Sequence, residues 1–321
     1  MDAVLRLRSL HRLRPRTRCG FTHCARRRQP RHESRLVESR RCRGSISWSQ
    51  AATRFVGILN AASNLNWGDV VKGGSAFPVR LKFSKFGKVR WTSHRDIARM
   101  FERAFRILEL PLEFSEGFSP HPKVSFGLAL STGYESNEEY LDVSLTQPID
   151  LETLPERLTT ALPLGITVVR AIALDDRVPA LQETVTAVEW IVEVARDDDV
   201  AIGLDEFASA VDAALARDEI TIERSRKGKL VDDDVRGAIR HCRVSQGSVE
   251  GTIVCDLEVS TQPRSAKPLD VLAAIMQVTP AIGPLVERNV LRVHQWIERD
   301  GARLSPLDAD ARPHVATARA S

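Results

Sequence analysis

The chain has 321 residues, of which 43% are hydrophobic, and its 46 Lys and Arg residues nearly balance 42 Asp and Glu residues. This length allows about two domains, and the hydrophobic content suits packed cores, which excludes a wholly disordered chain. No apolar run approaches the roughly 18 residues of a membrane-spanning helix, and no apolar stretch of a secretory signal occurs near the start. We therefore expect a cytoplasmic protein without a membrane partner.

Residues 1–76 are predicted to form a disordered basic tail. Residues 1–75 carry 16 Lys and Arg against 4 Asp and Glu, so the remainder of the chain is net acidic. Three interpretations of the tail remain open: an arm that binds nucleic acid, an organellar transit peptide, and a translation start assigned too far upstream. Residues 1–50 contain fourteen arginines and no lysine, which favours the mis-assigned start. Cys19 and Cys24 lack the tight paired spacing of a zinc site, so neither a metal nor another cofactor is expected.

Folding is predicted to begin near Phe77. Residues 79–83 alternate between apolar and basic side chains, which predicts a strand, and residues 88–91 repeat the pattern as a hairpin arm or as a continuation past a bulge. Ser93 is an N-cap candidate with Asp96 three residues later, and apolar residues at helical spacing follow up to Leu108. Further elements are expected as strands at 112–114, 124–130 and 139–145, a helix at 151–161 and a strand at 166–171.

The same order of elements recurs in the second half. It is predicted as a strand at 188–194, a helix at 204–216, strands at 220–226 and 249–259, a helix at 269–278 and a strand at 286–297. Both halves therefore follow the order β-α-β-β-α-β. The predicted fold class is α+β, with two tandem ferredoxin-like domains at 77–180 and 181–300, whose antiparallel sheets carry helices on one face. A polar C-terminal tail is expected at 301–321.

A basic surface is predicted near the start of the first domain. Residues 79–106 contain nine basic residues and only Asp96 and Glu102 as acids. Arginines spaced by 4, 4 and 3 residues form a stripe opposite the apolar face of the helix, which is typical of phosphate binding, whereas the alternative is an ordinary solvated face. The candidate nucleic-acid-binding residues are Arg80, Lys82, Lys88, Arg90, Arg95, Arg99, Arg103, Arg106, His121 and Lys123.

A loop rich in proline and glycine is the second candidate site. Pro120 and Pro122 flank His121 and restrict its backbone to extended conformations. A rigid loop that presents His, Lys and Ser side chains suits an anionic or nucleotide ligand, whereas the alternative is that Pro and Gly only shape a long connection. The other residues of this motif loop are Ser115, Glu116, Gly117, Phe118 and Ser119.

Catalysis is a weaker prediction. His94 and His121 are candidates for an acid and base pair that cleaves RNA through its 2′-hydroxyl group. The sequence contains no Walker loop, no G-x-G-x-x-G and no cysteine triplet for an iron–sulfur cluster. Cofactor chemistry is therefore expected only from a partner.

Four segments carry a family resemblance: Lys82–Lys85, Ser93–Asp96, Ser115–Lys123 and Glu138–Asp142. They resemble the radical SAM-linked protein family, a domain of unknown function. The resemblance is close over 77–180 and fades over 181–300. In that family the domain occurs fused behind a radical SAM enzyme or alone, often encoded beside a ribonuclease of the E/G type. This chain resembles the stand-alone form, which implies an association with such an enzyme and no mechanism.

The leading hypothesis is a non-catalytic RNA-binding or substrate-presenting protein. It would serve an RNA-modifying enzyme of the radical SAM type or an RNA-processing enzyme, in tRNA or rRNA processing. A metal-independent endoribonuclease with the tandem ferredoxin-like plan is one alternative. A protein-interaction scaffold for a ribonuclease is the other.

Overall fold

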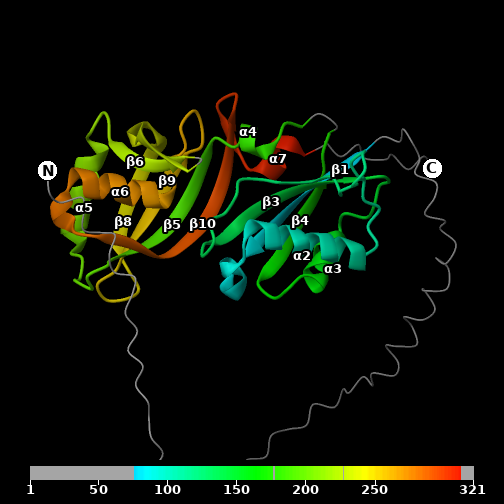
Figure 1. The fold of residues 1–321 in the computed structure, drawn as a ribbon, viewed down its shortest axis with the longest axis horizontal. Coiled ribbons are helices and arrows are strands. Elements are labelled where there is room, and N and C mark those ends of the chain that lie inside the picture. The colour runs from blue at the N-terminus through cyan, green and yellow to red at the C-terminus, as the bar shows by residue number, and fades with distance from the viewer. Residues whose placement is uncertain (1–75, 176–177, 227, 312–321) are drawn as a thin grey trace, which may run out of the picture. The chain divides into compact units, whose positions relative to one another are not determined.

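The structure is a computed structural model that describes residues 76–311 apart from 176, 177 and 227 (Figure 1). The predicted basic tail, its cysteines and its three interpretations lie outside these residues, as do residues 312–321. None of the helices within 76–311 combines the length and the apolar character needed to cross a membrane.

The first half of the described chain contains one sheet segment and two main helices. Its elements are β1 (Phe77–Lys85), the short 3₁₀-helix η1 (Gly87–Trp91), α2 (His94–Ile107), β2 (Val124–Phe126), β3 (Glu135–Leu145), α3 (Leu154–Ala161) and β4 (Ile166–Ala173). The strands β4, β1 and β3 are neighbours in that order, and β2 pairs with β3. All of these pairs are antiparallel.

The helix α2 begins where the sequence predicts it. The backbone N–H of Asp96 donates to the hydroxyl of Ser93 at 3.2 Å, which is the expected N-cap. The ring of Phe101 lies 4.8 Å from that of Phe83 on β1, so the apolar helix face packs on the sheet. The buried residues of this face are Ile97, Phe101, Ala104 and Phe105. The predicted helix and its cap are confirmed.

The segment Gly87–Trp91 is a 3₁₀-helix and not the predicted strand. Gly87 has a φ of +68°, a conformation that turns the chain out of the direction of β1. The backbone N–H and the hydroxyl of Thr92 both donate to the carbonyl of Val89, at 3.0 and 2.6 Å, and close the turn. Alternating residues of this segment therefore do not lie on two faces of a sheet.

The second half repeats the order of strands and helices with an insertion. Its elements are α4 (Leu181–Thr184), β5 (Ala187–Arg196), α5 (Leu204–Leu215), β6 (Thr221–Arg226), β7 (Lys229–Asp234), the 3₁₀-helix η2 (Arg236–Ala238), β8 (Ile239–Gln246), β9 (Ile253–Ser260), α6 (Pro268–Val278), the 3₁₀-helix η3 (Pro280–Ile282) and β10 (Leu285–Arg299). The strands β10, β5, β9 and β8 are antiparallel neighbours in that order. The inserted hairpin of β6 and β7 forms a sheet of its own.

Two strands of the second half were absent from the sequence prediction. β7 carries consecutive aspartates, and β8 exposes Arg240, Arg243 and Ser245 while a register shift between Ile239 and His241 interrupts its alternation. Edge strands with polar side chains and bulges of this kind avoid pairing with other chains. Because of these polar residues, β8 lacks the alternating hydrophobic pattern from which a strand is predicted.

The two halves share one continuous sheet. β3 and β10 run parallel and pair at Glu135 with Leu291 and at Ser136 with Arg292, so the strand order is β4-β1-β3-β10-β5-β9-β8 (Figure 1). The α+β class and the mostly antiparallel sheet are confirmed. The assignment of two ferredoxin-like domains stays a prediction.

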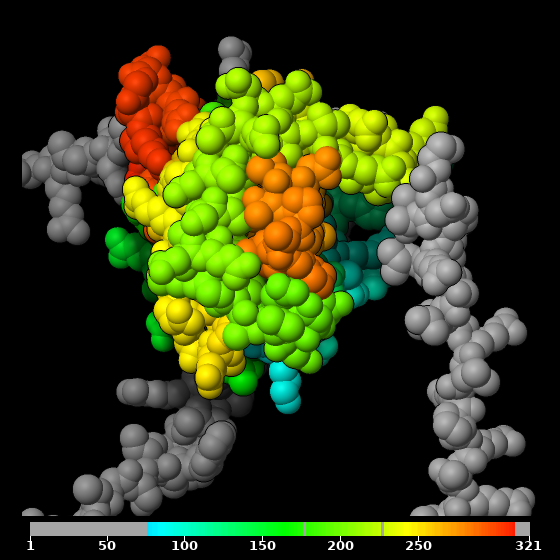
Figure 2. Space-filling model, turned by 90° about the vertical axis from the view of Figure 1, so that its left-hand side faces the viewer, coloured from blue at the N-terminus to red at the C-terminus, as the bar shows by residue number. Residues whose placement is uncertain are grey.

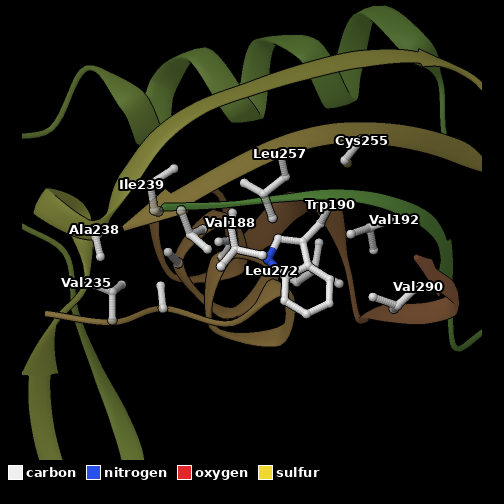
Figure 3. Packing of buried hydrophobic residues seen from close by; sticks show 14 of the residues in the cluster. Val188, Trp190, Val192, Val235, Ala238, Ile239, Cys255, Leu257, Leu272 and Val290 are labelled. Atoms are coloured by element: carbon white, nitrogen blue, oxygen red, sulfur yellow. The ribbon is translucent and has the colours of Figure 1, made fainter. Parts of the chain in front are cut away.

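The core of the second half lies between the sheet and the helices α5 and α6. Val188, Trp190 and Val192 on β5 point into it together with Leu257 on β9 (Figure 3). Seen from this end of the molecule, α5 and α6 form much of the outer surface (Figure 2). A separate cluster of buried residues under α2 and α3 forms the core of the first half.

Residues 302–310 lie in the expected polar tail but are ordered elements of the fold. β11 (Ala302–Leu304) pairs with β10, and α7 (Pro306–Asp310) lies against the first half. The guanidinium of Arg80, which is completely buried on β1, contacts Asp310 at 2.7 Å and donates to the carbonyl of Pro306 at 3.0 Å. It also contacts Asp142 on β3 at 2.7 Å. This ion pair network ties the C-terminal segment to the first strand.

We expect Arg80→Met to destabilise the protein strongly. The substitution removes the buried cation that Asp142 and Asp310 share and leaves Asp310 only the partly exposed Arg299 at 3.1 Å, and breaking one side of a buried pair costs about 3–5 kcal/mol. Arg170→Met is the control, because the pair of Arg170 with Asp308 is exposed and such pairs contribute less than about 1 kcal/mol. Urea unfolding of both variants measures the difference. Equal stabilities would show that the buried network contributes little.

Candidate functional site

The basic strand face predicted on β1 is neutralised by carboxylates. Arg80 is enclosed by Asp142 and Asp310, and Lys82 is paired with Glu138. Arg90 lies 3.7 Å from Glu135. A buried or paired cation offers little to a phosphate, because its hydrogen-bond donors are already used. Arg80 is therefore removed from the candidate nucleic-acid-binding residues, and Lys82 and Arg90 are weakened as candidates.

The arginine stripe on α2 faces solvent. Arg95, Arg99, Arg103 and Arg106 are all exposed, on the side of the helix opposite its buried face. Two of them make contacts within α2 itself: Arg99 lies 3.3 Å from Asp96, and Nε of Arg106 donates to the carbonyl of Glu102 at 3.3 Å. Exposed ion pairs of this kind stabilise a fold by less than about 1 kcal/mol and are readily exchanged for other partners.

The stripe has the dimensions of an extended contact. From Arg95 to Arg106 the helix advances by eleven residue steps, or about 16 Å at 1.5 Å per residue. Lys88 is also exposed and lies on η1, just before the helix. We call these five residues the α2 cationic face. The structure thus separates the predicted basic residues into a paired set on the sheet and an exposed set on the helix.

The motif loop closes on itself beyond the C-terminal end of α2. The backbone N–H of Ser115 donates to the carbonyl of His121 at 2.8 Å, and the N–H of His121 donates to the hydroxyl of Ser115 at 3.1 Å. Lys123 is paired with Glu113 at the base of the loop. The loop residues from Glu116 to His121 are exposed. The loop is therefore held by its own contacts and presents its tip to solvent.

The two histidines considered as acid and base lie far apart along the chain path. The ring of His94 packs 4.9 Å from that of Phe126 at the end of β2. His121 precedes Phe126 by five residues of extended backbone, which corresponds to about 16 Å. General acid–base catalysis requires both groups within hydrogen-bond reach of the reacting atoms. These positions do not support a histidine pair.

A buried charge cluster at the junction of the halves was not predicted from the sequence. Arg292 on β10 donates to Glu139 on β3 at 2.9 Å and to the carbonyls of Leu128 and Ala129. Lys85 at the end of β1 is also buried, with the carbonyls of Arg90 and Thr92 3.3 and 3.5 Å from its amine. The one available signal was the charged pair at 138–139 directly before the apolar residues of a strand.

Burial perturbs the ionisation of this cluster in opposite directions for acid and base. Desolvation lowers the pKa of Lys85, with Arg292 adding to this effect and Glu139 opposing it. Desolvation also raises the pKa of Glu139, which Arg292 partly offsets. A cavity of about 20 Å³ adjoins both side chains and His94. It is large enough for only one or two water molecules.

Metal binding finds no support within residues 76–311. The described part of the chain contains no group of three or more His, Cys, Asp and Glu side chains arranged to hold a metal ion.

The chain belongs to a bacterial protein family. The family model described as "Uncharacterized protein conserved in bacteria (DUF2344)" matches residues 79–268, which is more than half of the chain. This agrees with the expected domain of unknown function, whereas the link to radical SAM enzymes stays a prediction. No curated protein matches the chain.

Two solved complexes contain chains with a weak structural similarity to this chain. A Cbf5-Nop10-Gar1 complex gives 10% identity and a TM-score of 0.38, over 68% of this chain and 48% of that chain. An archaeal box H/ACA sRNP Nop10-Cbf5 complex gives 9% identity and a TM-score of 0.35, over 67% and 46%. The chain spans about half the length of these proteins, and similarity at this level does not establish a common fold.

We expect Lys85→Met to remove a pH-dependent part of the stability. Because the pKa of Lys85 is lowered by folding, the unfolded chain binds more protons below the ordinary lysine pKa, and stability rises as the pH increases toward about 10.4. The unfolding free energy of the wild type should therefore rise relative to that of the variant as the pH approaches the ordinary lysine pKa of about 10.4 from below. Urea unfolding across this range measures it, with Lys88→Met as an exposed control. If the unfolding free energies of the wild type and of Lys85→Met changed with pH in parallel, a lowered pKa of Lys85 in the folded protein would be contradicted.

Proposed function

We propose that this member of the DUF2344 family binds RNA through the α2 cationic face. The protein acts as a non-catalytic RNA-binding or substrate-presenting partner of an RNA-modifying or RNA-processing enzyme. The observation that carries the proposal is the row of exposed arginines on one helix face. The phosphate backbone of a nucleic acid is attracted to such a row, because each contact releases condensed counterions.

The distribution of charge over the molecule supports this assignment. α2 has only Asp96 and Glu102 as acidic residues, so its outer face keeps a net positive charge. The exposed charges of α5 are all acidic: Asp205, Glu206 and Asp212. An ordinary solvated helix mixes both signs of charge along its outer face. The contrast between the two helices favours a specific anionic partner at α2 and not at α5.

The order of the strands supports a second proposal, which concerns the fold of each half. In each half the antiparallel strand order places the first strand between the fourth and the third, as β4-β1-β3-β2 and β10-β5-β9-β8. We propose that these are two ferredoxin-like units, at 77–180 and 181–300, fused through β3 and β10. RNA-recognition domains also use a four-stranded sheet with two helices, which is an argument by analogy only.

The enzyme served by this protein is proposed from the sequence resemblance alone. A radical SAM enzyme or an E/G-type ribonuclease would supply the chemistry, and RNA would be the shared substrate. Of the alternatives, metal-independent cleavage by His94 and His121 is the less supported, because His94 packs on Phe126 and the chain from His121 to Phe126 is extended. A scaffold that binds only a ribonuclease would not require exposed arginines.

We expect the triple variant Arg95→Glu, Arg99→Glu and Arg103→Glu to lose most RNA binding by the full chain. Loss of three phosphate contacts to a single strand should lower the slope of log affinity against log salt by roughly 2. Filter binding or fluorescence anisotropy at several salt concentrations measures both quantities. The thermal melt should be unchanged, because the three side chains are exposed.

The matched control reverses three exposed arginines elsewhere: Arg170→Glu, Arg217→Glu and Arg243→Glu. Both triple variants keep the basic residues of the N-terminal segment and the same net charge, so any difference between them reports the location of the lost charges. Equal affinities of the two variants for RNA would rule out the α2 cationic face as the binding surface.

A further inference from the structure

Trp91 is an exposed tryptophan at the start of the α2 cationic face. It ends η1, two residues before the N-cap of α2, and 64% of its surface is exposed. The other tryptophans among the described residues are not presented in this way. Trp190 is buried in the core of the second half, and the indole N–H of Trp296 donates to Glu189 at 3.0 Å.

The indole of Trp91 is nevertheless held in place. Gly133 lies against it so closely that a Cβ at this position would come within 2.9 Å of a ring carbon. The backbone N–H of Gly133 donates to the carbonyl of Arg90 at 2.7 Å, which fixes the two segments together. A side chain at position 133 would therefore displace the ring or break this contact.

The guanidinium of Arg90 is a second support for the ring. Its central carbon lies 5.0 Å from the centroid of the Trp91 ring, within the range of a cation–π contact. Nη1 of Arg90 donates to the side-chain oxygen of Asn289 at 3.1 Å and lies 3.7 Å from Glu135. The ring thus has a defined position that does not come from burial in the core.

An exposed, positioned aromatic ring beside a basic track is the arrangement that binds single-stranded nucleic acid. The basic side chains contact the phosphates, and an unpaired base stacks on the aromatic ring. Here Lys88 and Arg95 lie on either side of Trp91 in the sequence, and both are exposed. A base within a duplex is already stacked and paired, so an aromatic platform favours a strand with unpaired bases.

We propose that Trp91 is a stacking platform for an unpaired nucleobase at the N-terminal end of the α2 cationic face. The inference rests on the proposed RNA-binding function and specifies its ligand as single-stranded RNA, or a single-stranded segment of a folded RNA. The bases next to the stacked one would pass along α2 with their phosphates toward the arginines.

The experiment compares two ligands with and without bases. Full-length wild type, Trp91→Ala and Trp91→Phe are titrated with a short single-stranded RNA and with a base-free ribose-phosphate strand of the same length. Stacking contributes about 1–3 kcal/mol per base, so Trp91→Ala should weaken binding to the RNA by about 5- to 150-fold. Its affinity for the base-free strand should not change, and Trp91→Phe should retain most of the affinity for RNA.

Leu230→Ala is the control, because Leu230 on β7 is an apolar residue about as exposed as Trp91 and belongs to neither candidate site. Its affinity for both strands should equal that of the wild type. If Trp91→Ala loses affinity equally for both strands, Trp91 acts by positioning charged neighbours and the stacking proposal is overturned. It is also overturned if Trp91→Ala binds RNA normally while the arginine triple variant does not, in which case the proposed RNA-binding surface itself stands. Normal binding by the triple variant would instead contradict the proposed function.

Discussion

The contacts of the buried guanidinium of Arg292 stabilise the junction of the two halves, on which the continuous sheet depends. β10 pairs with β5 over most of its length but with β3 at only two positions, so the backbone alone connects the halves weakly. Arg292 lies at this junction, where it contacts Glu139 on β3 and lies 4.8 Å from the ring centroid of Trp190 on β5. Its two bonds to carbonyls of residues 128 and 129 also hold the connection between β2 and β3. One buried side chain therefore joins three segments, two of the first half and one of the second.

Much of the local structure could be predicted from the sequence because its causes are local. The cap at Ser93, the apolar spacing of α2 and the alternation of β1 and β5 all involve residues a few positions apart. Prediction was poorer where the cause is distant. The guanidinium of Arg80 meets carboxylates 62 and 230 residues later in the chain, and no local pattern distinguishes such a cation from an exposed one. The alternation on β1 was correctly interpreted as a strand and wrongly interpreted as an exposed basic face.

The candidate site was predictable to a similar extent. The spacing of the arginines on α2 indicates one helix face, and the structure places all four of them in solvent. Trp91 was not predicted as a site residue, because the sequence pattern assigned it to a strand, where aromatic residues are common. Its exposure follows from the turn at Gly87 and from the small residue at Gly133, whose neighbours in space are not neighbours in sequence. Lys85, Glu139 and Arg292 form a cluster only because β10 returns to the edge of β3.

The burial of cations in the sheet has a consequence for the surface charge. Each cation of β1 that is matched by a carboxylate is neutralised within the fold, so it contributes little to the electrostatic field outside. The arginines of α2 have only the two acidic residues of their own helix and keep most of their charge. An anionic strand approaching this half is therefore attracted to the helix and not to the sheet. In the proposed complex, the direction of α2 would give the bound strand two distinct ends. Trp91 precedes the first turn of the helix in the chain and the motif loop follows the last, so the proposed site would have a polarity that a uniform basic patch lacks.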